Sequence, residues 1–491
     1  MKRIHRPAVC IIISLIALVS ATAQQPSLDT LLTHVRTLAS ARYAGRLAGT
    51  EAYMDATQYT IDALQRYGVK PYQGDWIQHF EVECNEIENC SFNTYYNNSD
   101  TRTVYVLGND FSCAGMTGRG YADANVVFCG YGIDDASYNE YEKVDAQGKI
   151  ALVLSGVPSF LPSKVADRYR TPRDKARAAR RHGCCALVII NMSSSCSPNE
   201  VQTNVYSGEG PHLPTFPIIQ PHRSCGAQLL ADERISLDSV IDLLQTTMRP
   251  QSFHLRKRFE ININAKYHPA ALTGNVVGIM PGADSKMNNE YIVVGAHLDH
   301  LGMQGNTCIY PGADANASGV AVLLETARLL QAAEERPGRS IIFVLFSAAE
   351  NQRLGSQIFV SNFNPLKHVE AFVGIECVGS GDSLAVLGNN KYPGLWQVAN
   401  QMDSAHTQMM VHNFKTNPKG DALAFDHVGI PSITLTNYNG NLKWHVPSDI
   451  PENIYRGMIT KAAHLSFETV YELSFGDYQG RSAQSRRYRF E

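Results

Sequence analysis

The sequence predicts an α/β protein built from two units. From about residue 275 onward, short apolar runs alternate with helical runs such as GVAVLLETARLLQAAEE, a pattern typical of strands buried between helices. A second series of apolar runs, between residues 120 and 250, indicates a separate and smaller unit. The length of 491 residues is also more than one ordinary domain needs.

The first 23 residues have the pattern of a secretory signal peptide. Lys2, Arg3 and Arg6 precede the apolar run AVCIIISLIALVS, and the small residues ATA at 21–23 provide a cleavage site. The apolar run is too short for a comfortable membrane span, and no later stretch is apolar for long enough. We therefore expect a protein without a membrane span that is exported to the periplasm or out of the cell.

Residues 27–66 predict two helices that open the mature chain. LDTLLTHVRTLAS and YMDATQYTIDALQRYG place apolar residues three and four positions apart, so each helix has one apolar face. Gly68 follows the second segment in the usual position of a left-handed C-cap.

In the smaller unit, the strand-like runs NVVFCGYG, KIALVLSGV and CALVIINMS alternate with a basic helical run, RDKARAARRHG. The pattern of this helix favours a solvated face over a binding surface. A net charge of −3 gives no broad basic field, so we expect no nucleic-acid partner. The basic segment 476–491 is interpreted as a solvated tail.

The cysteines do not indicate a structural zinc site. Of eleven cysteines, Cys10 lies in the signal segment, and none shows paired CxxC spacing. Export permits disulfides, and Cys84 and Cys90 in ECNEIENC are a plausible local pair.

In the larger unit, polar residues follow the predicted strands, where ligands usually bind in such sheets. His297 and Asp299 follow EYIVVGA, Glu350 follows SIIFVLF, Glu376 lies in AFVGIECV, and His445 lies in KWHVPSD. Zinc takes imidazole and carboxylate ligands, and it lowers the pKa of a bound water to about 7. Each residue alone is a weak signal, but together they predict the zinc site of a hydrolytic enzyme.

Five motifs, namely GAHLDHLG, PGADANASGVAVLLE, SAAENQRLGSQIF, GIECVG and WHVPSD, resemble in order the signature of the clan MH zinc exopeptidases, the leucyl-aminopeptidase and glutamate-carboxypeptidase type. The resemblance implies an α/β/α sandwich with a mixed central sheet. Residues 119–262, with CGYG and HGCCALVIIN, resemble the protease-associated domain that many members carry as an insertion. The exopeptidase-like domain is thereby divided between residues 24–118 and 263–475.

The resemblance also implies roles for individual positions. His297, Glu350, Glu376 and His445 match metal ligands, although the family usually has an aspartate where Glu376 stands. Asp299 matches the companion aspartate that orients the first histidine ligand.

A pocket-lining segment of the family matches KGDALAFDHVGIP, which places Asp421 and Phe425 in a substrate pocket. The family often has a histidine where Ala422 follows that aspartate.

Two carboxylate positions of the resembled family are alanines here. One motif of the family usually reads Gly-Ala-Asp-Asp-Asn-x-Ser-Gly, and its second aspartate bridges two zincs. That position is Ala315 here. The family's Glu-Glu pair, a general base followed by a zinc ligand, matches Ala349 and Glu350. Without a bridge, two zincs about 3.5–4 Å apart are hard to hold together. Loss of a base typically costs about a hundred- to ten-thousand-fold in rate. We therefore expect one tightly bound zinc or fewer, with Asp314 as a candidate substitute ligand.

Two functions remain open. One is an exported zinc exopeptidase that removes N-terminal residues from peptides, with impaired activity. The other is a catalytically inactive pseudo-peptidase that binds peptides or unfolded protein N-termini. A glutaminyl cyclase shares this fold with one zinc, but it retains the acidic pair, so Ala349 counts against that interpretation.

Overall fold

The computed structural model describes residues 25–97, 99, 101–192, 210–413, 415–440, 445–476 and 478–480. The expected signal peptide, and residues 481–491 of the expected basic tail, lie outside these ranges. Within the described ranges, no helix is both long enough and apolar enough to cross a membrane.

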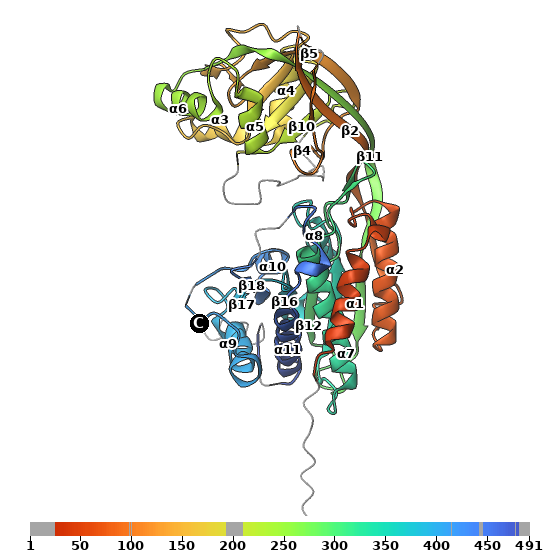
Figure 1. Cartoon of the computed structure of the whole chain (residues 1–491). Helices are drawn as coiled ribbons and strands as arrows, with labels where there is room; N and C mark the ends of the chain where they lie inside the picture. The colour runs from red at the N-terminus through yellow and green to blue at the C-terminus, as the bar shows by residue number, and fades with distance from the viewer. Residues whose placement is uncertain are drawn as a thin grey trace, which may run out of the picture.

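Two long antiparallel strands connect the two units of the molecule (Figure 1). These are β2 (Ile77–Tyr96) and β11 (Phe253–Met280), which pair along most of their length. The first half of β11 pairs with β5 (Gly120–Phe128) of the smaller unit, and its last residues pair with β15 (Ser340–Phe346) of the larger unit. One hydrogen-bonded sheet therefore runs through both units.

In the larger unit the strand order is β17–β18–β16–β12–β15–β11. Strands β12, β15, β16 and β18 run parallel, whereas β11 and β17 are antiparallel to their neighbours. The sheet is therefore mixed, as expected. The other strands of this unit are β1 (Lys70–Pro71), β12 (Tyr291–His297), β13 (Met303–Gln304), β14 (Cys308–Ile309), β16 (Val369–Ile375), β17 (Ser383–Leu387) and β18 (Ser432–Tyr438).

Helices cover both faces of this sheet. Successive strand residues point to opposite faces, so Ile292 and Val294 pack into one apolar core while Val293 packs into another. The first core includes α1, α2, α7, α9 and α11, and the second includes α8 and α10. The predicted α/β/α sandwich is confirmed. Its helices are α1 (Leu28–Leu38), α2 (Glu51–Arg66), α7 (Gly319–Ala332), α8 (Leu354–Asn362), α9 (Pro393–Met402), α10 (Ala422–His427) and α11 (Arg456–Leu473).

The two opening helices begin and end where their sequences indicate. Ser27 and Thr50 cap α1 and α2, with each hydroxyl oxygen accepting a hydrogen bond from a backbone amide of the first turn. Gly68 has φ +75° just beyond α2, which confirms the predicted left-handed cap.

The smaller unit has its own apolar core. Strands β5, β8, β9 and β10 run parallel, and β4 pairs antiparallel with β10 at the edge. Its basic helix α4 is not wholly solvated, because Lys175 is buried and donates a hydrogen bond from Nζ to the Gly156 carbonyl at 2.7 Å. The remaining elements of this part of the chain are β3 (Thr103–Tyr105), β4 (Phe111–Cys113), β6 (Asp134–Asp135), β7 (Tyr138–Asn139), β8 (Ile150–Leu154), α3 (Ser163–Arg168), α4 (Pro172–Arg181), β9 (Ala186–Ile190), β10 (Ile218–Pro221), α5 (Arg223–Leu230) and α6 (Leu237–Thr247).

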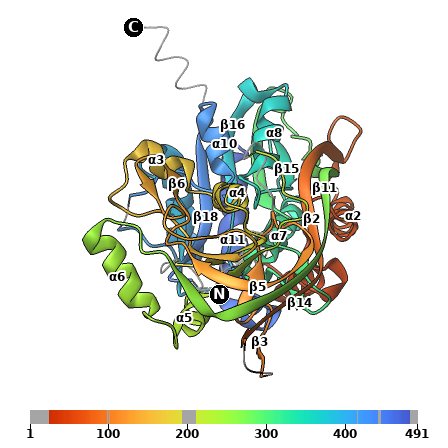
Figure 2. The same cartoon turned by 90° about the horizontal axis from the view of Figure 1, so that it is seen from above.

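The direction of β11 decides which end of the larger sheet faces the smaller unit. β11 enters the larger unit from the smaller one, so the antiparallel β15 runs back toward the smaller unit. Strands β12, β16 and β18 share the direction of β15. The carboxyl ends of all four strands therefore point toward the smaller unit, which lies over that end of the sheet in Figures 1 and 2.

The connecting strands also correct the sequence interpretation. Neither β2 nor the first half of β11 was predicted, and the expected domain boundary at 262/263 falls inside the continuous strand β11. Cys84 and Cys90 both belong to β2, where six positions of extended chain span about 20 Å. They are therefore too far apart to form the proposed local disulfide, and both are free.

Candidate metal centre

The candidate ligands lie at the carboxyl ends of neighbouring strands. His297 is the last residue of β12, while Glu350, Glu376 and His445 follow β15, β16 and β18. Because these strands are parallel neighbours, the four residues are placed at one edge of the sheet.

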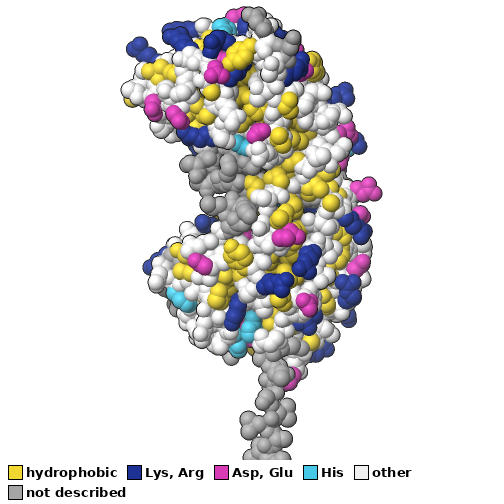
Figure 3. Space-filling view, in the orientation of Figure 1, with side chains coloured by type: hydrophobic (Ala, Val, Ile, Leu, Met, Phe, Trp, Pro, Cys, Tyr) yellow, Lys and Arg dark blue, Asp and Glu magenta, His cyan; other side chains and the backbone are white. Residues whose placement is uncertain are grey.

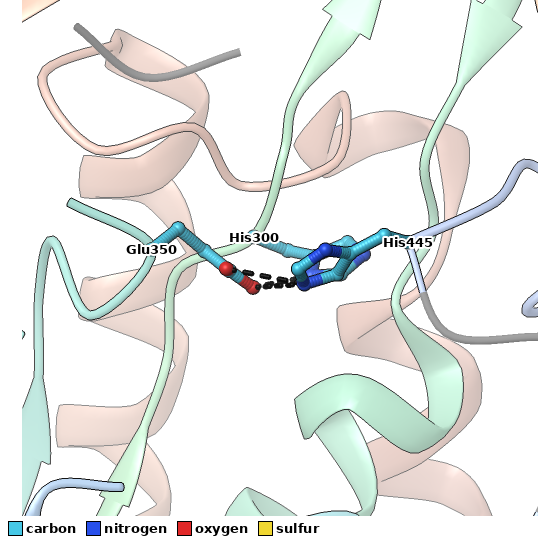
Figure 4. Close-up of side chains that lie close together, drawn as sticks. All are labelled: His300, Glu350 and His445. Carbon is cyan, nitrogen blue, oxygen red and sulfur yellow. Dashed lines mark hydrogen bonds and ion pairs between the residues drawn. The ribbon is translucent and has the colours of Figure 1, made fainter. Parts of the chain in front are cut away.

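Figure 4 shows that the structure brings together His300, Glu350 and His445. The Oε1 atom of Glu350 lies 3.1 Å from Nδ1 of His300 and 3.2 Å from Nε2 of His445. The three residues offer ligand atoms that all lie within 4.8 Å of one another. His300 was not predicted from the sequence, although HLDHLG contains a second histidine three positions after His297.

Electrostatics favour the ligand-competent forms of two of these groups. Burial lowers the pKa of His300 to about 4, so its imidazole is neutral near pH 7. Burial opposes ionisation of Glu350, but His445 and His300 together hold its pKa well below the usual range. The pair therefore combines a neutral imidazole with a charged carboxylate.

His297 is oriented by backbone more than by the expected carboxylate. Its Nδ1 lies 3.1 Å from the backbone carbonyl oxygen of Asp299 and 4.0 Å from the Asp299 carboxylate. That carboxylate instead accepts hydrogen bonds from the amides of Ala349 at 3.0 Å and Glu350 at 3.2 Å. Asp299 thus fixes the loop that carries Ala349 and the candidate ligand Glu350.

A second buried carboxylate supports the bridge position in the same way. Ala315 is almost fully buried in the segment Ala313–Ser318 that precedes α7, and its backbone there is not helical, with φ −110° and ψ 84°. Asp449 accepts hydrogen bonds from the amides of Asp314 at 2.9 Å and Ala315 at 3.0 Å. The backbone at the bridge position is therefore held, although its side chain carries no ligand.

Asp314 does not enter the three-residue cluster. Its carboxylate accepts hydrogen bonds from the Gly379 amide at 2.7 Å, from Asn437 Nδ2 at 3.2 Å and from the Ser380 hydroxyl. These protein groups occupy both of its oxygens, so a role as substitute ligand would require Asp314 to leave them.

Glu376 belongs to a separate acidic region with Asp421. Burial, followed by the charge of Asp421, raises the pKa of Glu376 to about 7. Burial opposes protonation of His297, yet nearby carboxylates, including Glu376 and Asp421, raise its pKa above the usual value. Gly420 leaves room for Glu376, since a Cβ there would lie 2.0 Å from Glu376 Oε1.

A cavity of about 270 Å³ adjoins this region. Ala315, Glu376, Asp314 and Asp449 contribute to its wall together with Cys377, Leu387, Lys419, Thr436, Asn437 and Gly440. Neither Asp421 nor Phe425 is part of this wall.

Of the two residues expected in the substrate pocket, Asp421 is buried at the start of α10, and Phe425 lies in the apolar core. The Phe425 ring stacks on Phe372, with centroids 3.9 Å apart. The structure thus places Phe425 in an apolar core rather than in the cavity wall.

Arg46 is a further buried residue that sequence reasoning missed. Its guanidinium is fully buried and donates hydrogen bonds to the carbonyl oxygens of Leu298 at 2.9 Å, Pro311 at 2.8 Å and Gly312 at 3.0 Å, as well as to Leu38. It therefore ties the opening segment to the loops on both sides of the site. A single arginine in AGRLAGT carries no local signal for this role.

The fold and the donor types at its strand ends are similar to those of metallo-exopeptidase domains. Residues 275–470 match the model of Peptidase family M28, and residues 116–223 match that of the PA domain. The chain therefore has a peptidase M28 domain with an inserted PA domain, which fits the clan MH zinc exopeptidases.

Curated relatives include a receptor and peptidases. Transferrin receptor protein 2 of Homo sapiens is 25% identical over 401 residues, which cover 69% of this chain and 46% of the relative. Aminopeptidase YwaD of Bacillus subtilis (strain 168) is 24% identical over 348 residues, which cover 68% of this chain and 64% of the relative. The chain thus spans about half to two-thirds of the length of these relatives.

Solved structures show the same fold. BSAP, a zinc aminopeptidase from Bacillus subtilis, matches with a TM-score of 0.63 at 19% identity, over 92% of this chain and 96% of that one. The aminopeptidase from Aneurinibacillus sp. strain AM-1 matches with a TM-score of 0.62 at 19% identity, over 92% and 94% of the two chains.

The residues present fit the zinc that this fold implies. Two imidazoles and a carboxylate are donor types that zinc takes, and three protein ligands leave a fourth position open.

Proposed function

We propose that this chain is an exported, aminopeptidase-like zinc exopeptidase with impaired hydrolysis. The observation that carries the proposal is that the backbone at two positions is held in place while the side chains there lack a carboxylate. The amides of Ala349 and Ala315 are still held by Asp299 and Asp449, whereas neither alanine supplies a carboxylate. The backbone is arranged for the chemistry of a two-metal peptidase, but the base and the bridge are lacking.

The residues that remain can bind and orient a peptide N-terminus. Glu376, Asp314 and Asp449 place carboxylates at the cavity, which favours a cationic amine over an anionic group. When bound, zinc would polarise the substrate carbonyl and lower the pKa of a water. Without a carboxylate at position 349, proton removal from that water loses a factor of about 10² to 10⁴.

The smaller unit is proposed to limit access to this cleft. The carboxyl ends of β12, β15, β16 and β18 point toward it, so it stands on the side from which a substrate must approach. Basic and acidic side chains are interspersed on the face drawn in Figure 3, which supports peptide partners rather than nucleic acid. Export rests on the N-terminal pattern of basic, apolar and small residues.

A pseudo-peptidase that acts by binding is the second candidate. The two alanines favour it, and one relative is itself named a receptor. In this case the cleft would hold a peptide or an unfolded N-terminus without cleaving it.

Turnover by the purified chain separates these candidates. Aminoacyl p-nitroanilides and short peptides would be incubated with zinc, with a chelator, and with the His445→Ala variant. We expect slow release of the N-terminal residue that the chelator and the variant both abolish. The absence of a zinc-dependent rate, together with peptide binding by calorimetry, would favour the pseudo-peptidase. Rapid turnover by the unmodified chain would show that the roles given to positions 315 and 349 are wrong.

A further inference from the structure

We propose that a single zinc-type divalent ion is held by His300, Glu350 and His445, with His300 supplying the ligand that the bridge position no longer provides. This inference rests on the proposed function only in taking the chain to be a zinc-binding protein. It adds His300, which the motif resemblance does not assign, and it fixes the metal count at one.

The distances suit a tetrahedral ion. The Glu350 oxygen lies 3.1 Å from the facing nitrogen of His300 and 3.2 Å from that of His445. Nitrogen and oxygen ligands lie about 2.0–2.2 Å from zinc, so neighbouring ligands of a tetrahedron are about 3.3 Å apart. An ion could therefore replace the protons of these hydrogen bonds with little movement of the side chains.

His300 does not have the hydrogen bonds of an ordinary buried histidine. For comparison, His34 is buried with both nitrogens engaged, by the hydroxyls of Tyr59 at 2.7 Å and Tyr67 at 3.1 Å. The His300 ring is fully buried with one hydrogen bond, to Glu350, and its Nε2 has no partner among the described residues. Burying a polar ring with a single hydrogen bond costs free energy. The position of the His300 ring therefore favours a role as a metal ligand next to Glu350.

The backbone and a glycine fix this position of the ring. The His300 amide donates to the Arg46 carbonyl at 3.0 Å. A Cβ on Gly312 would lie 2.6 Å from two atoms of the His300 ring. The ring thus packs against the turn that leads to Ala315, where the bridging carboxylate of the resembled family would begin.

The other candidate ligands lack an equivalent third partner. Among the described residues, His297 and Glu376 do not join any group of three ligand atoms within 4.8 Å of one another. Two protein ligands are fewer than zinc sites use. The geometry therefore points to one ion rather than two.

The chain also offers a partly buried control cluster away from the candidate metal centre. His406, His464 and Glu468 form another group of ligand atoms within 4.8 Å, on α11 and the turn after α9. His464 and Glu468 are four residues apart on the helix at 3.2 Å, a spacing that ordinary helix ion pairs also produce. Zinc bound there must be distinguished from zinc at His300.

The test measures metal content and affinity in the full chain without reference to activity. Protein stripped by a chelator would be titrated with Zn²⁺ against a chromophoric competitor, and bound metal would be counted by mass spectrometry. Three variants, each with one histidine replaced by glutamine, would be compared: His300→Gln, His297→Gln and His464→Gln. We expect one zinc per wild-type chain and at least a hundredfold weaker binding in His300→Gln, since even residues behind a ligand typically cost about 10- to 100-fold. His297→Gln and His464→Gln should keep the tight site.

A spectroscopic measurement serves as the control for misfolding of the variants. Co²⁺ would replace zinc in the wild type and in both variants. The wild type is expected to show a visible absorption band with the intensity of tetrahedral Co²⁺. This band should shift in His300→Gln and stay unchanged in His297→Gln. If His300→Gln fails to fold by circular dichroism, the zinc position in wild-type crystals, located by anomalous scattering, decides the matter. Two zincs per chain, unchanged affinity in folded His300→Gln, or an ion located beside His297 and Glu376 would overturn the proposal. A protein that keeps this metal site but neither cleaves nor binds peptides would contradict the proposed function and leave the metal proposal intact. The two proposals can therefore be refuted independently.

Discussion

The Asp299 carboxylate accepts a hydrogen bond from the Ala349 amide at 3.0 Å, so the backbone is held at the position that the motif resemblance assigns to the general base. The same relationship recurs between Asp449 and the Ala315 amide, also at 3.0 Å. Both alanines therefore occupy fixed backbone positions, and a carboxylate introduced there would start from a defined place.

The double change Ala315→Asp with Ala349→Glu is expected to raise both zinc content and peptidase activity. A carboxylate at 315 would offset the repulsion of a second ion near His297 and Glu376, and one at 349 would accept a proton. Members of one catalytic unit are not additive, so each single change should gain much less than the pair. Steady-state kinetics and metal counts on all four proteins check this; equal gains from Ala349→Glu alone would contradict it.

Arg46→Met is expected to destabilise the larger unit strongly. The change removes hydrogen bonds to buried carbonyl oxygens, including those of Leu298, Pro311 and Gly312, and leaves them without these donors. We expect a loss of about 3 kcal/mol or more in the free energy of unfolding, followed by urea denaturation.

Arg42→Met is the matched control for this prediction. Arg42 is exposed, with its guanidinium 5.3 Å from the centre of the Tyr43 ring. Its replacement should change the free energy of unfolding by less than about 0.5 kcal/mol. Similar losses in both variants would mean that the buried hydrogen bonds of Arg46 contribute little.

His34 should make stability fall in mild acid. Burial lowers its pKa from 6.5 to about 4, so between these values the unfolded chain takes up a proton that the folded chain does not. The stabilisation is complete above pH 6.5 and is lost as the pH falls toward about 4, by up to about 3 kcal/mol. The difference in unfolding free energy between wild type and His34→Gln should shrink over this range. The exposed His427→Gln serves as control, and a pH-independent difference for His34→Gln would refute the prediction.

The exported protein should begin at or near Gln24. This expectation rests on Lys2, Arg3 and Arg6 before the apolar run and on the small residues at 21–23. N-terminal sequencing of material recovered outside the cytoplasm checks it, and retention of Met1 in that material would contradict it.

Much of the larger unit was predictable because its strands are buried on both faces. Uninterrupted apolar runs such as SIIFVLF predict strands whose two faces are both covered by helices. Strand β15 has the same bounds as this run. The long strand β2 was missed because IQHFEVECNEIENCSFNTYY carries charged and polar residues throughout, as suits a strand that connects two units and is partly exposed. Its extended form comes from pairing with β11, whose partner residues lie 161 (Lys257 to Tyr96) to 199 (Val276 to Ile77) positions further along the chain.

By itself, the sequence determined the alternation of strands and helices in the larger unit and the residue types at the strand ends. It also determined that positions 315 and 349 hold no carboxylate. Only the tertiary structure decided which polar residues meet. His300 lies beside Glu350 and His445, whereas Asp314 faces Gly379, Ser380 and Asn437 and Phe425 lies in the core. The physical reason is that the turns after a strand lack a fixed period, so the direction of each side chain there depends on packing and hydrogen bonds from distant segments such as Arg46.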